Sequence, residues 1–166
     1  VSSIRRRNLL RQLERMSYRD QLTQFGNRYA VDWFVEHEWN GEQIGVVYCD
    51  ITGLKKVNDE QGHEAGDRLI IRACECLAGV FKGYGLYRIG GDEFLVLCLG
   101  IEEKDLREHV EKLRMDMKEH QVTMAVGMIW KEHGPKDIDL LLNESERLMY
   151  EDKDRYYKEH GLKRRR

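Results

Sequence analysis

Two adjacent carboxylates stand at the start of an apolar run, where an unpaired negative charge is costly. Asp92 and Glu93 follow two glycines and lead directly into the apolar residues 94–99. Asp50 lies near the end of another apolar run, residues 44–51. A carboxylate beside buried apolar groups must be paired or must bind a cation. If the two runs are neighbouring strands, Asp50 and Asp92 lie together and supply the hard oxygen ligands that Mg²⁺ prefers.

Residues 50–67, which begin at the end of the apolar run 44–51, combine acidic, basic and amide side chains. An amide and a carboxylate, here Asn58 and Asp67, can together accept the hydrogen bonds that the guanine edge donates. Lys55 and Lys153 are compact positive charges suited to phosphate. The polar residues of this segment are Asp50, Lys55, Asn58, Asp59, His63 and Asp67.

Each of these side chains also has a purely structural interpretation. Asp50 and Asp92 could cap their own turns, and Asn58 could form an Asx-turn. Asp67 could be a carboxylate in the first turn of a helix, where the helix dipole favours it. His63 has no sequence neighbour that would make it a base, which favours a substrate contact or a loop-positioning role.

The elements that must hold these residues alternate along the chain. Apolar periodicity predicts helices over 28–39, 64–80, the stretch around Leu106–Met117, and 137–158. Short apolar, β-branched runs predict strands at 44–51, 85–89, 94–99 and 122–130, with a tight hairpin at 90–93 and a loop between 51 and 64. This order predicts an α/β (α+β) domain in which helices cover one sheet.

Composition narrows the classes of partner. The 166 residues include 28 basic and 30 acidic side chains, mixed along the chain, which gives no electrostatic footprint for nucleic acid. Because no apolar run approaches the roughly 20 residues of a membrane span, we expect a cytoplasmic domain without membrane contact, either alone or within a larger, membrane-anchored protein. Cys49, Cys74, Cys76 and Cys98 fit no zinc or redox spacing and are expected to be buried free thiols.

The first residues form a separate unit. Residues 4–19 predict an amphipathic helix with Leu9, Leu13 and Met16 on one narrow stripe. This helix either folds onto the domain or ends a longer coiled-coil signalling linker. We therefore divide the chain into a helix at 1–19 and a catalytic domain at 20–166.

Five segments together resemble, in order and spacing, the motifs of GGDEF-domain diguanylate cyclases. The resemblance covers nearly the whole chain from Asp20 to about Gly161. The segments are "DQLTQFGNR" (20–28), "DITGLKKVNDEQGHEAGD" (50–67), "RIGGDEF" (88–94), "VTMAVGM" (122–128) and "YEDK" (150–153).

The resemblance implies a fold, a reaction and partners. The fold would be that of nucleotidyl cyclases and polymerase palm domains, a ferredoxin-like domain with a mostly antiparallel sheet. The reaction condenses two GTP molecules into cyclic di-GMP, releases pyrophosphate, and needs Mg²⁺ or Mn²⁺. Catalysis would take place in a homodimer whose protomers each hold one GTP, under control of an upstream sensory domain.

The resemblance also implies roles for the acidic residues. Asp50 and Asp92 match the side-chain metal ligands, and Ile51 matches the residue that binds the metal through its carbonyl. Asp92 is also the expected base for the 3′-hydroxyl. Glu93 matches the fourth position of the GGDEF signature, residues 90–94, and is expected to support a second metal. Lys55 is expected to assist catalysis at the phosphates.

The substrate contacts follow in the same way. Asn58 and Asp67 match the guanine readers, and His63 matches a nearby substrate contact. Lys55 and Lys153 match the phosphate-binding lysines.

Several positions depart from the family pattern. Thr52 stands where a second Asp is usual, and Tyr157 where an Arg usually follows the phosphate lysine by one helical turn. Gln24 replaces a glycine, Leu54 replaces a Phe, and residues 81–84 (FKGY) lack the Arg and Asp of the inhibitory product site. These changes leave open a degenerate module that binds GTP or a partner without turnover. A mononucleotide cyclase is a third possibility.

Overall fold

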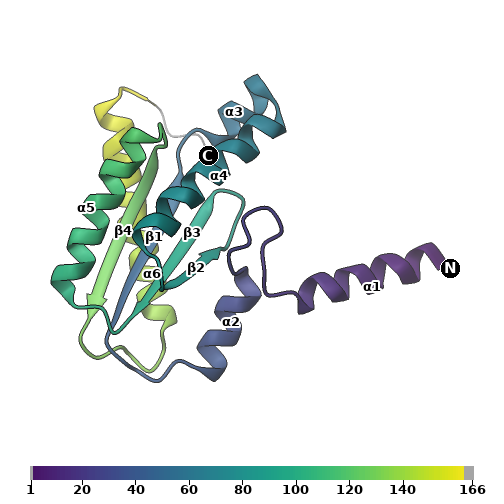
Figure 1. Cartoon of the computed structure of the whole chain (residues 1–166), viewed down its shortest axis with the longest axis horizontal. Helices are drawn as coiled ribbons and strands as arrows, with labels where there is room; N and C mark the ends of the chain where they lie inside the picture. Colours follow the sequence, from purple (N-terminus) through teal and green to yellow (C-terminus); the bar gives the residue numbers. More distant parts are fainter. Residues whose placement is uncertain (1, 163–166) are drawn as a thin grey trace.

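A four-stranded antiparallel sheet forms the centre of the molecule (Figure 1). The computed structural model describes residues 2–162. The strands are β1 (Ile44–Ile51), β2 (Gly85–Arg88), β3 (Glu93–Leu99) and β4 (Met124–Lys131), arranged in the order β2-β3-β1-β4. The α+β class, the antiparallel sheet and the central hairpin predicted from the sequence are confirmed.

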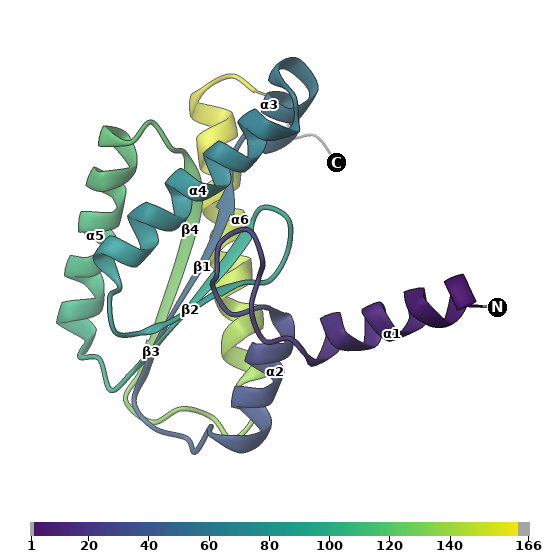
Figure 2. The same cartoon turned by 45° about the vertical axis from the view of Figure 1, so that its right-hand side comes forward.

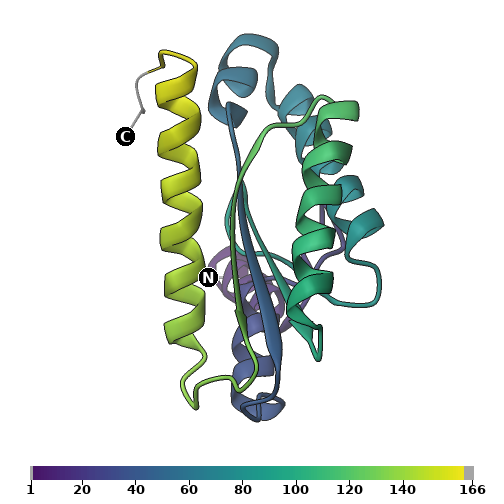
Figure 3. The same cartoon turned by 90° about the vertical axis from the view of Figure 1, so that its left-hand side faces the viewer.

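Helices cover both faces of this sheet (Figure 3). One face packs against α4 (His63–Val80) and α5 (Glu103–Glu119), and the other against α2 (Arg28–His37) and α6 (Asp139–Glu159). Because successive strand residues point to opposite faces, β1 divides between two cores. Val47, Cys49 and Ile51 join the first core, and Val46 and Tyr48 join the second. By the same alternation, Asp50 faces α6.

The predicted loop between 51 and 64 is wrong, because most of it is the short helix α3 (Leu54–Gln61). None of its residues is fully buried, so the sequence shows no strong apolar stripe there. Gly53 and Gly62 bound the helix with φ angles of +81° and +91°, which glycine adopts readily. The two sharp turns direct α3 outward and bring α4 back toward the sheet.

The four cysteines are buried and free, as predicted. Within residues 2–162, no helix is both long and apolar enough to cross a lipid bilayer.

The first helix, α1 (Ser2–Met16), extends away from the sheet (Figures 1 and 2). Leu9 and Leu13 are 56% and 54% exposed. The side chain of Met16 and the basic residues 163–166 lie outside the described part of the structure. The exposed stripe agrees with a linker that pairs with another helix, which stays a prediction.

Candidate active site

Three carboxylates converge where β1 ends and β3 begins. Asp50 lies directly opposite Glu93 in the β1–β3 register, and Asp92 precedes Glu93 in the hairpin. Each of the three offers an oxygen within 4.8 Å of the others. The sheet therefore brings together residues 42 and 43 positions apart in sequence, as expected for strand ends that share one edge.

Asp50 is the buried member of this cluster, with only 4% of its surface exposed. Its Oδ2 accepts a hydrogen bond from Lys153 Nζ at 3.2 Å, whereas its Oδ1 has no hydrogen-bond partner among the described residues. Burial, together with the nearby charge of Asp92, raises the pKa of Asp50 to about 7, although Lys153 opposes the shift. An unpaired buried oxygen among carboxylates is a geometry that a divalent cation would satisfy, so these residues fit Mg²⁺ or Mn²⁺.

The ionisation of Asp50 should destabilise the metal-free protein as the pH rises. Since the pKa in the folded state is about 7 and the ordinary value is 3.8, folding favours the protonated form. This stabilisation is complete below about pH 4 and is lost as the pH rises through about 7. Asp50→Asn cannot ionise, so its free energy of unfolding in EDTA should exceed that of wild type by a margin that grows between about pH 4 and about pH 7 and then stays constant. A margin that does not change with pH would contradict this assignment.

Backbone hydrogen bonds hold residues 89–92 in place, the loop between β2 and β3 that we call the signature loop. The Ile51 N–H donates to the Asp92 carbonyl at 2.8 Å, and the Ile89 N–H donates to the Glu93 carbonyl at 3.0 Å. Gly91 has no positive φ angle, and a Cβ there would meet no other atom. Within the described structure, a side chain at this position would meet no packing obstacle, so internal packing does not require glycine there.

An arginine that we did not assign from the sequence fixes the same loop. Arg88 donates to both carboxylate oxygens of Asp20 at 3.2 Å, and to the Gly91 carbonyl at 2.8 and 3.2 Å. Asp20 in turn accepts from the backbone and hydroxyl of Thr23. The segment that follows α1 therefore lies beside the signature loop (Figure 2) and is tied to it through one guanidinium.

If the chain has the cyclase activity that its motifs imply, Arg88→Ala should lower the catalytic rate by about tenfold to a hundredfold, because small misplacements of reacting groups cost that much. Arg88→Lys should not rescue the rate, since an ammonium cannot replace the planar fork that reaches Asp20 and Gly91 together. Arg147→Ala is the matched control, because the ion pairs of Arg147 with Glu144 and Glu151 lie exposed on α6. Initial rates at saturating GTP test this, and an Arg88→Ala rate within twofold of wild type would contradict it.

The two predicted guanine readers come from the junction of α3 and α4. The Asn58 side chain packs so closely on Gly66 that a Cβ there would come within 1.7 Å of Asn58 Oδ1. Asp67, the next residue, lies exposed in the second turn of α4. Because α4 begins at His63, the interpretation of Asp67 as a first-turn carboxylate is wrong. The junction places Asn58 and Asp67 near each other with Asp67 open to solvent.

The remaining predicted residues surround this junction and the acidic cluster. His63 is the first residue of α4, and Lys55 lies in the first turn of α3; both are exposed. Lys153 reaches the cluster from α6 and is part-buried. Lys153 therefore contacts the site directly, whereas the positions of Lys55 and His63 place them only on the helices beside it.

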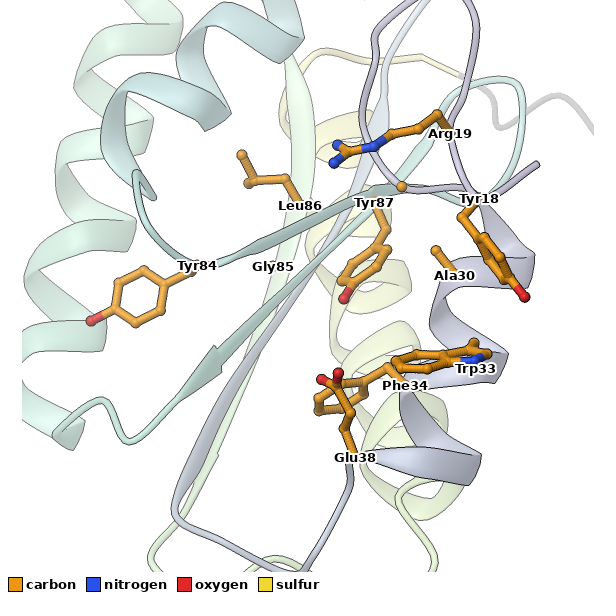
Figure 4. Close-up of a pocket in the computed structure, with 11 residues that line it drawn as sticks. Tyr18, Arg19, Ala30, Trp33, Phe34, Glu38, Tyr84, Gly85, Leu86 and Tyr87 are labelled. Atoms are coloured by element: carbon orange, nitrogen blue, oxygen red, sulfur yellow. The ribbon is translucent and has the colours of Figure 1, made fainter. Parts of the chain in front are cut away.

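A large hollow of the described surface lies away from this site (Figure 4). It holds about 550 Å³ between α2 and the edge strand β2. Its wall includes the aromatic side chains of Tyr18, Trp33 and Tyr87, and none of the predicted site residues contributes to it. The assignment of the site therefore depends on the carboxylates and not on cavity size.

A family model described as "Diguanylate cyclase, GGDEF domain" matches residues 17–158 of this chain. The chain belongs to the GGDEF-domain family. The match contains the acidic cluster, the α3–α4 junction and Lys153.

Individual relatives of this GGDEF domain carry different names. It is 28% identical over 152 residues to the diguanylate cyclase DgcP of Escherichia coli, which aligns 82% of this chain with 45% of DgcP. It is 30% identical over 151 residues to the cyclic di-GMP phosphodiesterase PdeR of the same organism, which aligns 81% of this chain with 22% of PdeR. The GGDEF domain thus spans less than half the length of either relative.

A solved structure shares the fold of this GGDEF domain. It is the coiled coil and GGDEF domain of DgcB from Caulobacter crescentus in complex with c-di-GMP, which matches with a TM-score of 0.73 at 21% identity. The match covers 97% of this chain and 91% of that one. The palm-like cyclase fold implied by the sequence motifs is therefore confirmed.

Two departures of this GGDEF domain from the family pattern have structural counterparts. Gln24, which replaces a glycine, keeps a left-handed backbone with φ of +62°, a conformation that costs a side chain about 1–2 kcal/mol. In place of the inhibitory Arg and Asp, Phe81 is fully buried and Tyr84 lies edge-on to His109, with ring centroids 6.2 Å apart. An aromatic cluster thus occupies the position where the family pattern has a charged pair.

The two departures nearest the chemistry change charge without disturbing the backbone. The Thr52 N–H donates to the Thr123 carbonyl at 2.8 Å, a backbone bond that an aspartate at position 52 could make equally well. Tyr157 lies edge-on to Tyr156, with ring centroids 5.9 Å apart. The site therefore lacks one negative and one positive charge relative to the family pattern.

Proposed function

We propose that this chain is an active diguanylate cyclase domain that condenses two GTP molecules into cyclic di-GMP and releases two pyrophosphates. The observation that supports this best is the buried, incompletely bonded carboxylate of Asp50 beside Asp92, Glu93 and Lys153. Such a cluster is costly for the metal-free protein, and a function at that position explains why it is present.

The acidic residues would hold the metal and receive the proton. Asp50, Asp92 and Glu93 would hold Mg²⁺ or Mn²⁺, with the Ile51 carbonyl as a further ligand. Bound there, the ion would neutralise charge on the triphosphate and make a neighbouring hydroxyl easier to deprotonate. Asp92 accepts the proton of the 3′-hydroxyl, whose oxygen then attacks the α-phosphate of the second GTP.

The other residues bind and orient the nucleotide. Asn58 and Asp67 accept the hydrogen bonds of the guanine edge, and His63 contacts the substrate beside them. Lys55 and Lys153 place positive charge at the phosphates, where negative charge develops during transfer. Because residues 2–162 of one chain contain a single acidic cluster of this kind, two chains would bring their GTP molecules together.

The alternative is a degenerate GGDEF module that binds GTP or a partner without turnover. The missing charges at Thr52 and Tyr157 favour it, and it agrees with a relative named for phosphodiesterase activity. Incubation with GTP and Mg²⁺, followed by chromatographic identification of products, separates the possibilities. The proposal predicts cyclic di-GMP, the degenerate module predicts unchanged GTP, and a mononucleotide cyclase would release cyclic GMP.

Specific activity should rise with enzyme concentration, because two half-sites must meet. The exposed Leu9 and Leu13 of α1 form the predicted linker stripe. Fusing a dimeric coiled coil in register before Ile4 should raise specific activity at dilute enzyme by about tenfold or more, through effective concentration.

The matched control for this fusion contains two extra residues between the coil and Ile4. The insertion rotates α1 by about 200° relative to the coiled coil, so the Leu9–Leu13 stripe no longer continues the contact line of the coil. This control fusion should therefore gain less activity than the in-register fusion. Specific activity that is independent of dilution and unchanged by either fusion would contradict a dimeric mechanism.

A further inference from the structure

A tyrosine behind the acidic cluster contacts one of its members. Tyr48 lies on β1 two residues before Asp50, so both side chains point to the α6 face of the sheet. Its hydroxyl lies 2.6 Å from Glu93 Oε2. Since an ionised carboxylate only accepts, the tyrosine donates this bond.

The position of the Tyr48 hydroxyl is fixed by packing. The residue is only 4% exposed and belongs to the core formed by α2, α6 and one face of the sheet. Glu93, in contrast, is half-buried at the start of β3 and ends in a flexible side chain.

We infer that Tyr48 is a positioning residue, which holds Glu93 Oε2 so that the rest of that carboxylate stays within the cluster formed with Asp50 and Asp92. Without the Tyr48 hydroxyl, the Glu93 carboxylate can turn toward solvent, and the cluster then loses the oxygen that Glu93 contributes. Partners that orient metal ligands in this way typically contribute tenfold to a hundredfold to metal affinity. The inference depends on the proposed metal site, which the experiment tests separately.

The experiment measures Mn²⁺ affinity in the presence of a GTP analogue that cannot react, by the electron paramagnetic resonance of free Mn²⁺. Tyr48→Phe keeps the ring in the core and should weaken Mn²⁺ binding by about tenfold. Tyr87→Phe is the control, because Tyr87 is a half-buried tyrosine of the same core whose charged neighbour is Glu38 and not the cluster. The control should bind Mn²⁺ as wild type does.

A double variant tests whether Tyr48 acts through Glu93. Glu93→Gln should weaken Mn²⁺ binding by itself, and adding Tyr48→Phe should then cause little further loss, because the two residues act as one unit. Losses that add in full would overturn the inference, as would a Tyr48→Phe affinity within twofold of wild type.

Asp50→Asn separates this inference from the proposed function. If neither Asp50→Asn nor Glu93→Gln weakens Mn²⁺ binding, the metal site itself is wrong, and the role of Tyr48 fails with it. If both weaken it and Tyr48→Phe does not, only the role of Tyr48 is wrong. Near-identical melting temperatures of Tyr48→Phe and Tyr87→Phe would show that any loss of affinity does not come from unfolding.

Discussion

Asp92→Asn and Asp50→Asn are each expected to lower the rate of cyclic di-GMP formation by at least about a thousandfold, because charge stabilisation at the reacting phosphate supplies that much. Asparagine keeps the size of the side chain but cannot accept a proton, and it holds a divalent cation poorly. The fold should persist, since removing one of three clustered carboxylates relieves repulsion in the metal-free protein. Initial rates and the free energy of unfolding, measured on the same preparations, test both parts.

Asp105→Asn is the control for these two variants. Asp105 is an exposed acid in the first turn of α5, distant in the fold from the cluster. Its rate should match that of wild type. Turnover above about a tenth of the wild-type rate in either Asp50→Asn or Asp92→Asn would contradict the assignment of the acidic cluster, given the size of the expected loss.

Asp67→Ser should lower the preference for GTP over ATP by about tenfold to a hundredfold, because a bound base would cover Asp67 and ATP would then leave its carboxylate without a hydrogen-bond donor. Guanine presents N1–H and N2–H₂ donors to a carboxylate, whereas adenine presents an acceptor to the same place. ATP therefore leaves the carboxylate facing a lone pair, and sites built on hydrogen bonds reject such analogues strongly. A hydroxyl can donate or accept, so serine tolerates both bases. Competition between the two nucleotides measures the ratio directly.

Two further variants sharpen the test of base choice. Asp67→Ala should weaken GTP binding without strengthening ATP binding, because the change removes the acceptor and adds no donor. Asp59→Ser changes an exposed acid on the neighbouring helix α3 and should leave the ratio unchanged. If Asp67 were only a helix carboxylate, its substitution would change stability alone, and an unchanged ratio would remove Asp67 from the site.

The sequence predicted the parts of the molecule that depend on periodicity. β1 has the same bounds as its predicted strand, because eight consecutive residues of that run are buried. The opposite holds for α3, which buries no residue completely and depends on the turns at Gly53 and Gly62 instead of on an apolar stripe. A short exposed helix leaves little pattern in a sequence, so the segment resembled a loop.

The same distinction applies to the site. The sequence predicted that Asp50 and Asp92 lie close together, because both stand at the ends of apolar runs with the pattern of β-strands. Arg88 and Asp20 are 68 positions apart, and no sequence pattern indicates which acid an arginine will meet. For Tyr48, the sequence indicated only that it shares a strand face with Asp50. Its 2.6 Å contact with Glu93 depends on the register of β1 with β3, which the sequence pattern does not give.

The most direct test of the central claim is to measure cyclic di-GMP and pyrophosphate in one reaction of the coiled-coil fusion with GTP and Mg²⁺. The condensation of two GTP molecules predicts two pyrophosphates for each cyclic di-GMP, formed at the same rate and stopped by EDTA. Asp92→Asn in the same fusion gives the background. Unchanged GTP, or one pyrophosphate for each cyclic GMP, would contradict the assignment of this chain as an active diguanylate cyclase.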